Sequence, residues 1–363
     1  MGKIFFKILR IILAVLVLLL LVFSVIKLVQ ILRYKIKTEN GIQESSYIKI
    51  GDIEQFIRIR GENTDNPIVL FIHGGPGFPI GYLSYIFQAD LEDSYTFVQW
   101  DQRNCGRTYY RNKDKKTVLS HQVMMQDLDE LVDYLLRRFD KQKIIIMGQS
   151  WGTVLGLEYA SINPDKVLSY VGVGQVVDFD LGKIEAAKAA ISMIESKSHS
   201  EGSDEDKKTL EQAISLFETE KNISDIDISN LETMIVTSLK YLKGDKESGA
   251  IKLISMGLFS PVSNLQDLKW FLIAGNTKAI FTHEEPLVQY MYYEFDAYKL
   301  YKDFDVPVFF ISGDSDWITP YTMVKEYSEY INAPKKNFVL INGAGHTPFL
   351  DLPDNFNKVF KSY

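Results

Sequence analysis

The segment Gly148 to Gly152, with the sequence GQSWG, constrains this chain more than any other because of what flanks it. The apolar run Ile144 to Met147 precedes it, and helical sequence from Thr153 to Ser161 follows it. A serine on a tight strand-to-helix turn needs glycine two positions to either side, so that neighbouring backbone can pass closely and the hydroxyl stands clear. The helix N-terminus beneath the serine favours negative charge there. The pattern therefore predicts a nucleophilic Ser150, although G-x-S-x-G also occurs by chance in glycine-containing turns.

Apolar runs of strand length recur along the chain. The runs Ile68 to Ile72, Tyr95 to Trp100 and Ile144 to Met147 are continuous rather than alternating, which suits strands of a sheet covered on both faces. The segment Val123 to Phe139 separates the last two and has the spacing of an amphipathic helix, so we expect a parallel sheet. The other predicted strands are Tyr47 to Ile50, Phe56 to Ile59, Leu168 to Val173, Val308 to Ile311 and Phe338 to Ile341.

The strand pattern stops at about residue 176 and resumes only after residue 300. The intervening sequence is helical and rich in charge, and its polar stretch Ser196 to Lys208 is predicted to be an exposed loop. An all-helical segment between two strands of one sheet is best interpreted as a cap over the active-site face. We therefore predict a core at 45–175 and 301–363, a helical cap at 176–300, and a polar connector from Thr38 to Ser45 before the first strand.

The loop His73 to Gly77 directly follows the predicted strand Ile68 to Ile72. An α/β hydrolase places the loop that supplies its second oxyanion donor at this position. We predict that the N–H groups of Gly75 and Trp151 form the oxyanion hole, because glycines let the backbone approach the reacting oxygen. A plain glycine-proline turn is the alternative, and His73 is expected to be a structural loop residue.

Two further side chains emerge at strand ends on the same predicted edge. Asp316 follows the strand that ends near Ser312, and His346 follows the strand that ends near Ile341. The chain order Ser, Asp, His is the one expected for α/β hydrolases. We predict that His346 takes the proton of Ser150 and that Asp316 orients it, with Asp314 as the rival acid. The remaining histidines are expected to be surface or packing residues: His121, His199 and His283.

Together, several motifs resemble the proline iminopeptidase family of serine aminopeptidases. That resemblance implies the α/β-hydrolase fold, with a mostly parallel eight-stranded sheet and an inserted helical cap. It also implies release of an N-terminal residue, typically proline, from small peptides, without a metal or organic cofactor. The motifs are HGGPG at 73–77, DQRNCGRT at 101–108, GQSWG at 148–152, GDSDWITP at 313–320 and GAGH at 343–346.

The chain departs from that family in two places. Asn104 and Cys105 stand where the family usually has glycine and serine, and the cap lacks the Trp-x-x-Trp-Glu pattern whose glutamate binds the substrate amine. An aromatic-rich stretch with a carboxylate can also receive an ammonium group. The candidate acids in the cap are therefore Glu284, Glu285 and Glu294, and the alternative for these residues is a solvated acidic helix face.

Other functions use the same residues. An esterase or lactonase would use the same triad, because acyl-transfer machinery does not reveal its leaving group. A non-catalytic protein that binds a ligand in the capped cleft is a further alternative. The formal charge of −7 leaves no footprint for nucleic acid, and the one cysteine, Cys105, excludes an intramolecular disulfide or a cysteine-based zinc site.

The N-terminus is predicted to be a membrane anchor. The uncharged run Ile11 to Ile26, apolar except for Ser24, is shorter than the roughly 20 residues of a typical span. It extends to about Ile4 to Leu32 (residues 4–32) if the charged side chains of Arg10 and Lys27 reach the interface. A cleaved signal peptide is the alternative, but no small-x-small cleavage site follows. Positive charge nearly balances across the run, so the positive-inside rule does not fix the orientation. We expect an extracytoplasmic enzyme domain.

Overall fold

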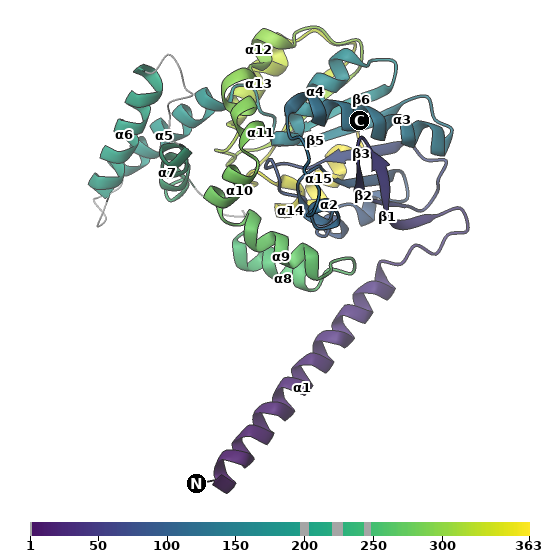
Figure 1. The fold of residues 1–363 in the computed structure, drawn as a ribbon. Coiled ribbons are helices and arrows are strands. Elements are labelled where there is room, and N and C mark those ends of the chain that lie inside the picture. Colours follow the sequence, from purple (N-terminus) through teal and green to yellow (C-terminus); the bar gives the residue numbers. More distant parts are fainter. Residues whose placement is uncertain (1, 197–202, 220–227, 243–247) are drawn as a thin grey trace.

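The computed structural model describes residues 2–196, 203–219, 228–242 and 248–363. Within these residues, the centre of the molecule is an eight-stranded sheet with the order β1-β2-β4-β3-β5-β6-β7-β8 (Figure 1). β2 pairs antiparallel with β1 and β4, and the other neighbours are parallel. The strands are β1 (Ile42–Ile50), β2 (Ile53–Gly61), β3 (Ile68–Ile72), β4 (Thr96–Asp101), β5 (Ile144–Gln149), β6 (Val167–Val173), β7 (Val308–Gly313) and β8 (Lys336–Ile341).

The predicted mostly parallel sheet is confirmed, with one correction at its first edge. β1 begins at Ile42, inside the stretch Thr38 to Ser45 that was predicted to be a polar connector. Ile42 pairs with Gly61 of β2, and the ladder continues without interruption to Ile50. An edge strand needs only one buried face, so polar residues alternate along it and weaken its apolar signal.

Both faces of the sheet are covered, as the continuous apolar runs predicted. Along β3, Ile68, Leu70 and Ile72 belong to one buried cluster, whereas Val69 and Phe71 belong to another. Side chains alternate between the two faces of a strand, so a strand that packs on both must be apolar throughout. Helices α3 and α4 contribute to the first cluster, and α14 and α15 contribute to the second.

The described residues between β6 and β7 form helices and contribute no strand to the sheet. In Figure 1 the helices α5, α6 and α7 lie at one side of the sheet, with α8 and α9 below them. The helices are α1 (Gly2–Arg33), α2 (Gly106–Asn112), α3 (His121–Phe139), α4 (Trp151–Ile162), α5 (Phe179–Ser196), α6 (Ser203–Thr219), α7 (Ile228–Leu239), α8 (Ala250–Leu258), α9 (Leu265–Ala274), α10 (Thr277–His283), α11 (Glu285–Gln289), α12 (Ala297–Leu300), α13 (Tyr321–Tyr330), α14 (Pro348–Asp351) and α15 (Pro353–Phe360), with the short turns η1 (Ser84–Ile86), η2 (Ala89–Leu91) and η4 (Tyr290–Glu294).

One prediction in this helical region was wrong for the part that the structure describes. The stretch Ser196 to Lys208 was predicted to be an exposed loop, but Ser196 ends α5 and residues from Ser203 onward belong to α6. Residues 197–202 lie outside the described residues. Acidic side chains occupy the first turn of α6, where they interact favourably with the positive end of the helix dipole. The same run of charged residues gave the segment the composition of a loop.

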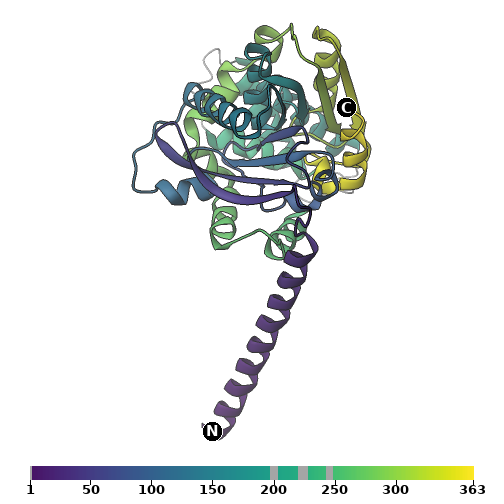
Figure 2. The same ribbon diagram turned by 90° about the vertical axis from the view of Figure 1, so that its right-hand side faces the viewer.

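Helix α1 projects away from the body of the molecule in both views (Figures 1 and 2). Its segment Ile4–Arg33 is long and apolar enough to cross a membrane, and its most apolar stretch is not buried against protein. By length and composition it fits a membrane anchor or a signal sequence. Near its end, Phe23 contacts Phe259 with 5.7 Å between ring centroids, and Lys27 Nζ donates to the backbone oxygen and hydroxyl of Ser263 at 3.0 Å each.

Candidate active site

Ser150 lies on the sharp turn between β5 and α4. Its φ of 52° places it in the left-handed region, which is uncommon for a residue other than glycine. A Cβ at Gly148 would lie 2.5 Å from the oxygen of Gly152, and a Cβ at Gly152 would lie 2.0 Å from the oxygen of Ile72. Both glycines are therefore required by close backbone approach, which is the physical reason for the spacing G-x-S-x-G.

Asp316 and His346 are brought together although they follow different strands. Nδ1 of His346 lies 3.0 Å from Oδ1 and 2.9 Å from Oδ2 of Asp316. Asp316 is buried, and it also accepts hydrogen bonds from the backbone N–H of Ile318 and from the N–H and hydroxyl of Thr319. Burial acts to raise the pKa of Asp316, but His346 and Thr319 outweigh it and hold that pKa below its ordinary value. Asp316 is thus built to stay ionised beside the imidazole.

The rival acid Asp314 faces a different group. Its Oδ1 accepts hydrogen bonds from the hydroxyl of Ser315 and from the backbone N–H of Gly343. This carboxylate therefore joins the loop after β7 to the loop after β8. The structure places Asp316, not Asp314, against His346.

Ser150 and His346 both lie beside the backbone at the end of β6, where Val173 is followed by Gly174. The backbone N–H of Ser150 donates to the oxygen of Val173 at 3.1 Å. The next residue, Gly174, has a φ of +57°, and a Cβ there would lie 3.1 Å from the ring of His346 and from Asp316. Among the described residues no hydrogen bond joins the Ser150 hydroxyl to His346. Such bonds commonly tighten only when substrate binds.

The two predicted oxyanion donors lie on adjacent segments. Trp151 is the first residue of α4, and Gly75 has a φ of +117° in the loop after β3. Within the part of the chain that the structure describes, the backbone N–H groups of both residues donate to no protein acceptor. A Cβ at Gly74 would lie 2.8 Å from Cβ of Ser150, so this loop passes directly beside the serine.

His73 holds the loop after β3 to the loop after β4. Its Nδ1 lies 2.9 Å from the oxygen of Gly74, and its Nε2 accepts from the backbone N–H of Gln102 at 3.3 Å. The amide of Gln102 in turn donates to the oxygen of His73 and accepts from the indole N–H of Trp151. Complete burial lowers the pKa of His73 to about 4, so the ring is neutral near neutral pH. This geometry agrees with the structural role expected for His73.

The three acids proposed for substrate binding occupy different places. Glu285 and Glu294 are exposed, so the structure gives them no place in a closed site. Glu284 is buried between α10 and α11, and a Cβ at Gly77 would lie 2.8 Å from its Cγ. Its Oε1 accepts a hydrogen bond from Nδ2 of Asn104 at 3.3 Å, and within the described residues its Oε2 has no partner. Burial raises the pKa of Glu284 well above its ordinary value, and the Asn104 bond only partly offsets this.

The structure shows how Asn104, one of the departures from the family motif, is accommodated. Its φ of 67° requires the left-handed conformation, which glycine adopts freely and asparagine tolerates better than most residues. Unlike glycine, Asn104 also reaches into the cap, because its Nδ2 donates to the oxygen of His283 and to Glu284. His283 Nε2 contacts the oxygen of Asn104 at 2.9 Å. Asn104 therefore ties the loop after β4 to Glu284 between α10 and α11.

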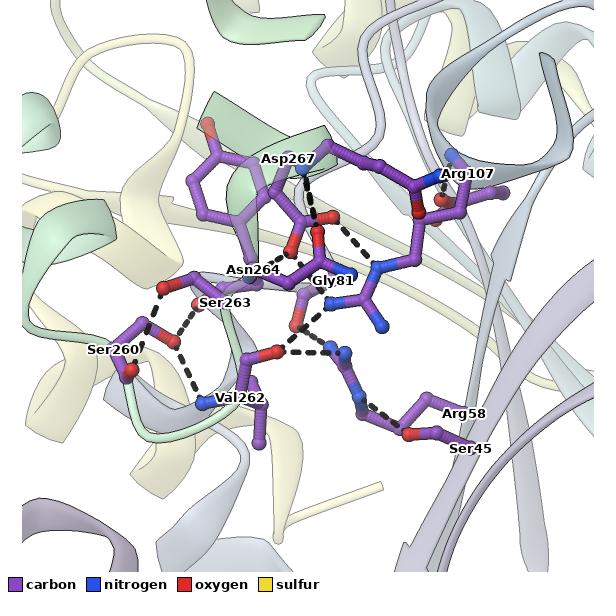
Figure 3. A network of polar contacts seen from close by, with 12 residues as sticks. Ser45, Arg58, Gly81, Arg107, Ser260, Val262, Ser263, Asn264 and Asp267 are labelled. Atoms are coloured by element: carbon purple, nitrogen blue, oxygen red, sulfur yellow. Dashed lines mark hydrogen bonds and ion pairs between the residues drawn. The ribbon is translucent and has the colours of Figure 1, made fainter. Parts of the chain in front are cut away.

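A buried polar network on α9 is a second tie between the sheet and the helical insertion (Figure 3). Arg107 of α2 contacts Asp267 through Nε at 2.9 Å and Nη2 at 2.6 Å, and Nη2 also donates to the oxygen of Val262. Arg58 of β2 donates to the same Val262 oxygen and to the oxygen of Gly81. Deeper along α9, the indole N–H of Trp270 donates to the oxygen of Gly77 at 2.8 Å. Helix α9 thus packs directly on the loop after β3.

Comparison with known proteins shows what this arrangement resembles. The family described as alpha/beta hydrolase fold matches residues 67–193. A Bacillus subtilis protein named probable aminopeptidase YbaC is 29% identical over 323 residues, which are 85% of this chain and 92% of that protein. This chain has the α/β-hydrolase fold and resembles the proline iminopeptidases. The proline iminopeptidase of Lactobacillus delbrueckii subsp. bulgaricus is 25% identical over 321 residues, covering 87% of this chain and 96% of the relative.

The solved structures agree on the fold. The crystal structure of the Mycobacterium smegmatis proline iminopeptidase superposes on this hydrolase with a TM-score of 0.58 at 18% identity, covering 88% of this chain and 97% of the other. This superposition supports the fold, and the curated relatives confirm the resemblance to the proline iminopeptidase family. The hydrolase also has, within its described residues, no group of three histidine, cysteine or acidic side chains placed to hold a metal ion.

Sequence reasoning did not identify several residues that shape this site. Thr319 holds Asp316, Gln102 links the two loops, and the buried Lys183 of α5 donates to the oxygen of Ile318 at 2.7 Å. Thr319 lies within a quoted motif and could have been singled out there. Lys183 carried no local signal, because a lysine in a charge-rich helix is usually solvated.

Proposed function

We propose that this hydrolase is a membrane-anchored serine aminopeptidase acting on short peptides or amino-acid amides with a free N-terminus. The observation that carries the proposal is the Asp316–His346 pair beside the Ser150 turn. Asp316 would fix the tautomer of His346, leaving Nε2 free to take the proton of the Ser150 hydroxyl. The serine would attack the carbonyl carbon, and His346 would then deliver the proton to the leaving amine as the acyl-enzyme forms.

Gly75 and Trp151 are the proposed stabilisers of the tetrahedral intermediate. Their unpartnered N–H groups would donate to the carbonyl oxygen as it becomes negative, and the N-terminus of α4 would add to this field. Such donors act strongly because they are already oriented before the reaction. Loss of one donor in a comparable site costs about 10²–10³ in kcat.

Glu284 is the proposed receptor for the free amine. Its carboxylate adjoins Gly77 of the oxyanion loop, and its Oε2 is buried without a partner among the described residues. A buried acceptor without a partner is costly, and an incoming ammonium group would both pair with it and lower its pKa. This assignment replaces the tryptophan-flanked glutamate that the cap lacks.

Labelling and a substrate panel test the catalytic assignment. A fluorophosphonate should label the full-length chain in detergent but not the Ser150→Ala variant. Amino-acid and dipeptide arylamides should then be compared with short-chain esters and lactones. Turnover of amides would support the peptidase, whereas activity confined to esters or lactones would replace it with the esterase alternative. Absence of labelling in the unsubstituted chain would indicate a non-catalytic binding protein.

We further propose that α1 stays attached and that the hydrolase domain is extracytoplasmic. Three basic residues precede the apolar run and four follow it up to residue 37, so charge alone does not orient the helix and this orientation needs a direct test. Mass spectrometry of the mature membrane-bound protein should recover residues before Ile11, which a cleaved signal peptide would remove. Protease added to intact cells or spheroplasts should digest the domain, and protection would place it in the cytoplasm.

A further inference from the structure

Helices α8 and α9 carry large apolar side chains that face away from the protein. Ile251 of α8 is 86% exposed, and Leu265 and Leu272 of α9 are 66% and 76% exposed. Ile254 lies one turn after Ile251, and Leu272 lies two turns after Leu265, so each pair shares one face of its helix. Isolated exposed leucines are ordinary, but two consecutive helices that each expose such a pair mark an interaction surface.

This surface lies at the level where α1 would leave the membrane. The loop that joins α8 to α9 contacts α1 twice, through Phe23 with Phe259 and through Lys27 with Ser263. Lys27 is the first charged residue after the apolar run Ile11 to Ile26. A helix rises about 1.5 Å per residue, and the hydrocarbon core is about 30 Å thick, so Lys27 falls near the boundary between acyl chains and headgroups.

The two views agree with this placement. In Figures 1 and 2, α8 and α9 occupy the end of the hydrolase domain from which α1 departs. If α1 spans a membrane, the contacts through Phe259 and Ser263 therefore hold α8 and α9 close to the membrane surface.

The charges of α8 and α9 suit a lipid surface. Among the described residues of these two helices, the exposed charged side chains are Lys252 and Lys269. The acid, Asp267, is buried in its ion pair with Arg107. Lys269 lies on the same face of α9 as Leu265 and Leu272, four residues after one and three before the other. Its long side chain can bind lipid phosphates while the leucines enter the interface.

We propose that the outer faces of α8 and α9, formed by Ile251, Ile254, Leu265 and Leu272, lie in the interfacial region of the bilayer that α1 spans. The occupant of this apolar surface is lipid. The inference rests on the proposed membrane anchor. Because the inner face of α9 carries Trp270, which donates to Gly77, a single helix separates the bilayer from the loop with the proposed oxyanion donor.

Site-specific fluorescence in nanodiscs tests the proposal with the full-length chain. The chain's single cysteine, Cys105, is buried, so the unsubstituted protein measures background labelling. The variants Leu265→Cys and Leu272→Cys would carry an environment-sensitive fluorophore, with lipids bearing nitroxides in their acyl chains as quenchers. Val17→Cys in α1 is the positive control. Ile162→Cys is the matched exposed control, because Ile162 is 59% exposed and ends α4, away from α1 (Figure 1).

We expect blue-shifted emission and nitroxide quenching at positions 265, 272 and 17, and neither at 162. Quenching at 17 but not at 265 or 272 would overturn the proposal while leaving the anchor intact. Absence of quenching at 17 would overturn the anchor and the proposal together. Blue-shifted emission at 265 and 272 without quenching by lipid would show that protein covers the surface, and would replace lipid with a second copy of the chain. Fluorophosphonate labelling of each variant checks that the fold is retained.

Discussion

Arg107 and Asp267 form a buried two-point ion pair that joins a core helix to a helix between β6 and β7. Nε and Nη2 of the guanidinium contact the two carboxylate oxygens at 2.9 and 2.6 Å. Asp267 also accepts from the backbone N–H of Asn264, which completes the capping box of α9. One carboxylate therefore begins a helix and holds it against the core.

Replacing this carboxylate should destabilise the protein strongly. Asp267→Asn leaves the buried charge of Arg107 without its partner, so we expect a loss of about 3–5 kcal/mol in the free energy of unfolding. Glu54→Gln is the control, because Glu54 pairs with Arg111 and both side chains are half-exposed. That change should cost less than about 1 kcal/mol. Chemical denaturation in detergent measures both, and equal losses would contradict the assignment.

Asp316→Asn should remove most catalysis without unfolding the chain. The amide would favour the wrong tautomer of His346, and a loss of about 10⁴ in kcat is expected for such a change. Asp314→Asn is matched in chemistry and lies two residues away, but Asp314 contacts Ser315 and Gly343 instead. Its kcat should change by much less. The rate of fluorophosphonate labelling provides a readout that needs no known substrate, and a larger loss with Asp314→Asn would reverse the two roles.

The effect of Glu284→Gln on KM should depend on whether the substrate carries a free amino group. We expect a higher KM for amides with a free N-terminus and little change for N-acetylated amides or simple esters, because only the former carry an ammonium group. Glu285→Gln, one residue later and exposed, should leave both classes unchanged. Equal losses on free and blocked substrates would mean that Glu284 supports the loop structure rather than the amine.

Lys183 should make stability depend on pH. Burial lowers its pKa to about 7, against the partly opposing effect of Asp316 and Asp180. Between that value and the ordinary value of 10.5, the unfolded chain holds a proton that the folded chain lacks, so stability rises with pH across this window. A difference of one bound proton between the unfolded and folded chains changes the free energy of unfolding by at most about 1.4 kcal/mol per pH unit.

The variant Lys183→Met isolates this effect. Because methionine does not titrate, the unsubstituted protein should gain stability relative to the variant as the pH rises from 7.5 to 9.5. Thermal unfolding of both proteins in the same detergent at each pH measures the difference. A constant difference across the series would show that Lys183 stays charged in the folded state, held by the Ile318 oxygen and by Phe179, whose ring centre lies 4.1 Å from Nζ.

Much of the core could be predicted because its signals are local. A strand that packs on both faces, such as β3, must be apolar throughout, and the turn at Ser150 needs glycines where backbones nearly touch. Parallel strands then bring their carboxyl ends to one edge, which places residues far apart in the chain near one another. The sequence by itself therefore determined the sheet, the position of the candidate nucleophile and the strand ends that carry its partners.

Only the tertiary structure decided which side chains meet. Asp314 and Asp316 are chemically identical and two residues apart, yet packing turns one to Gly343 and the other to His346. Neighbouring Glu284 and Glu285 differ in the same way, since one is buried against Gly77 and the other is exposed. The two residues of each pair are of the same type, so residue type does not distinguish them. Burial and partners come from segments more than a hundred residues away or from another loop, so no local pattern records them.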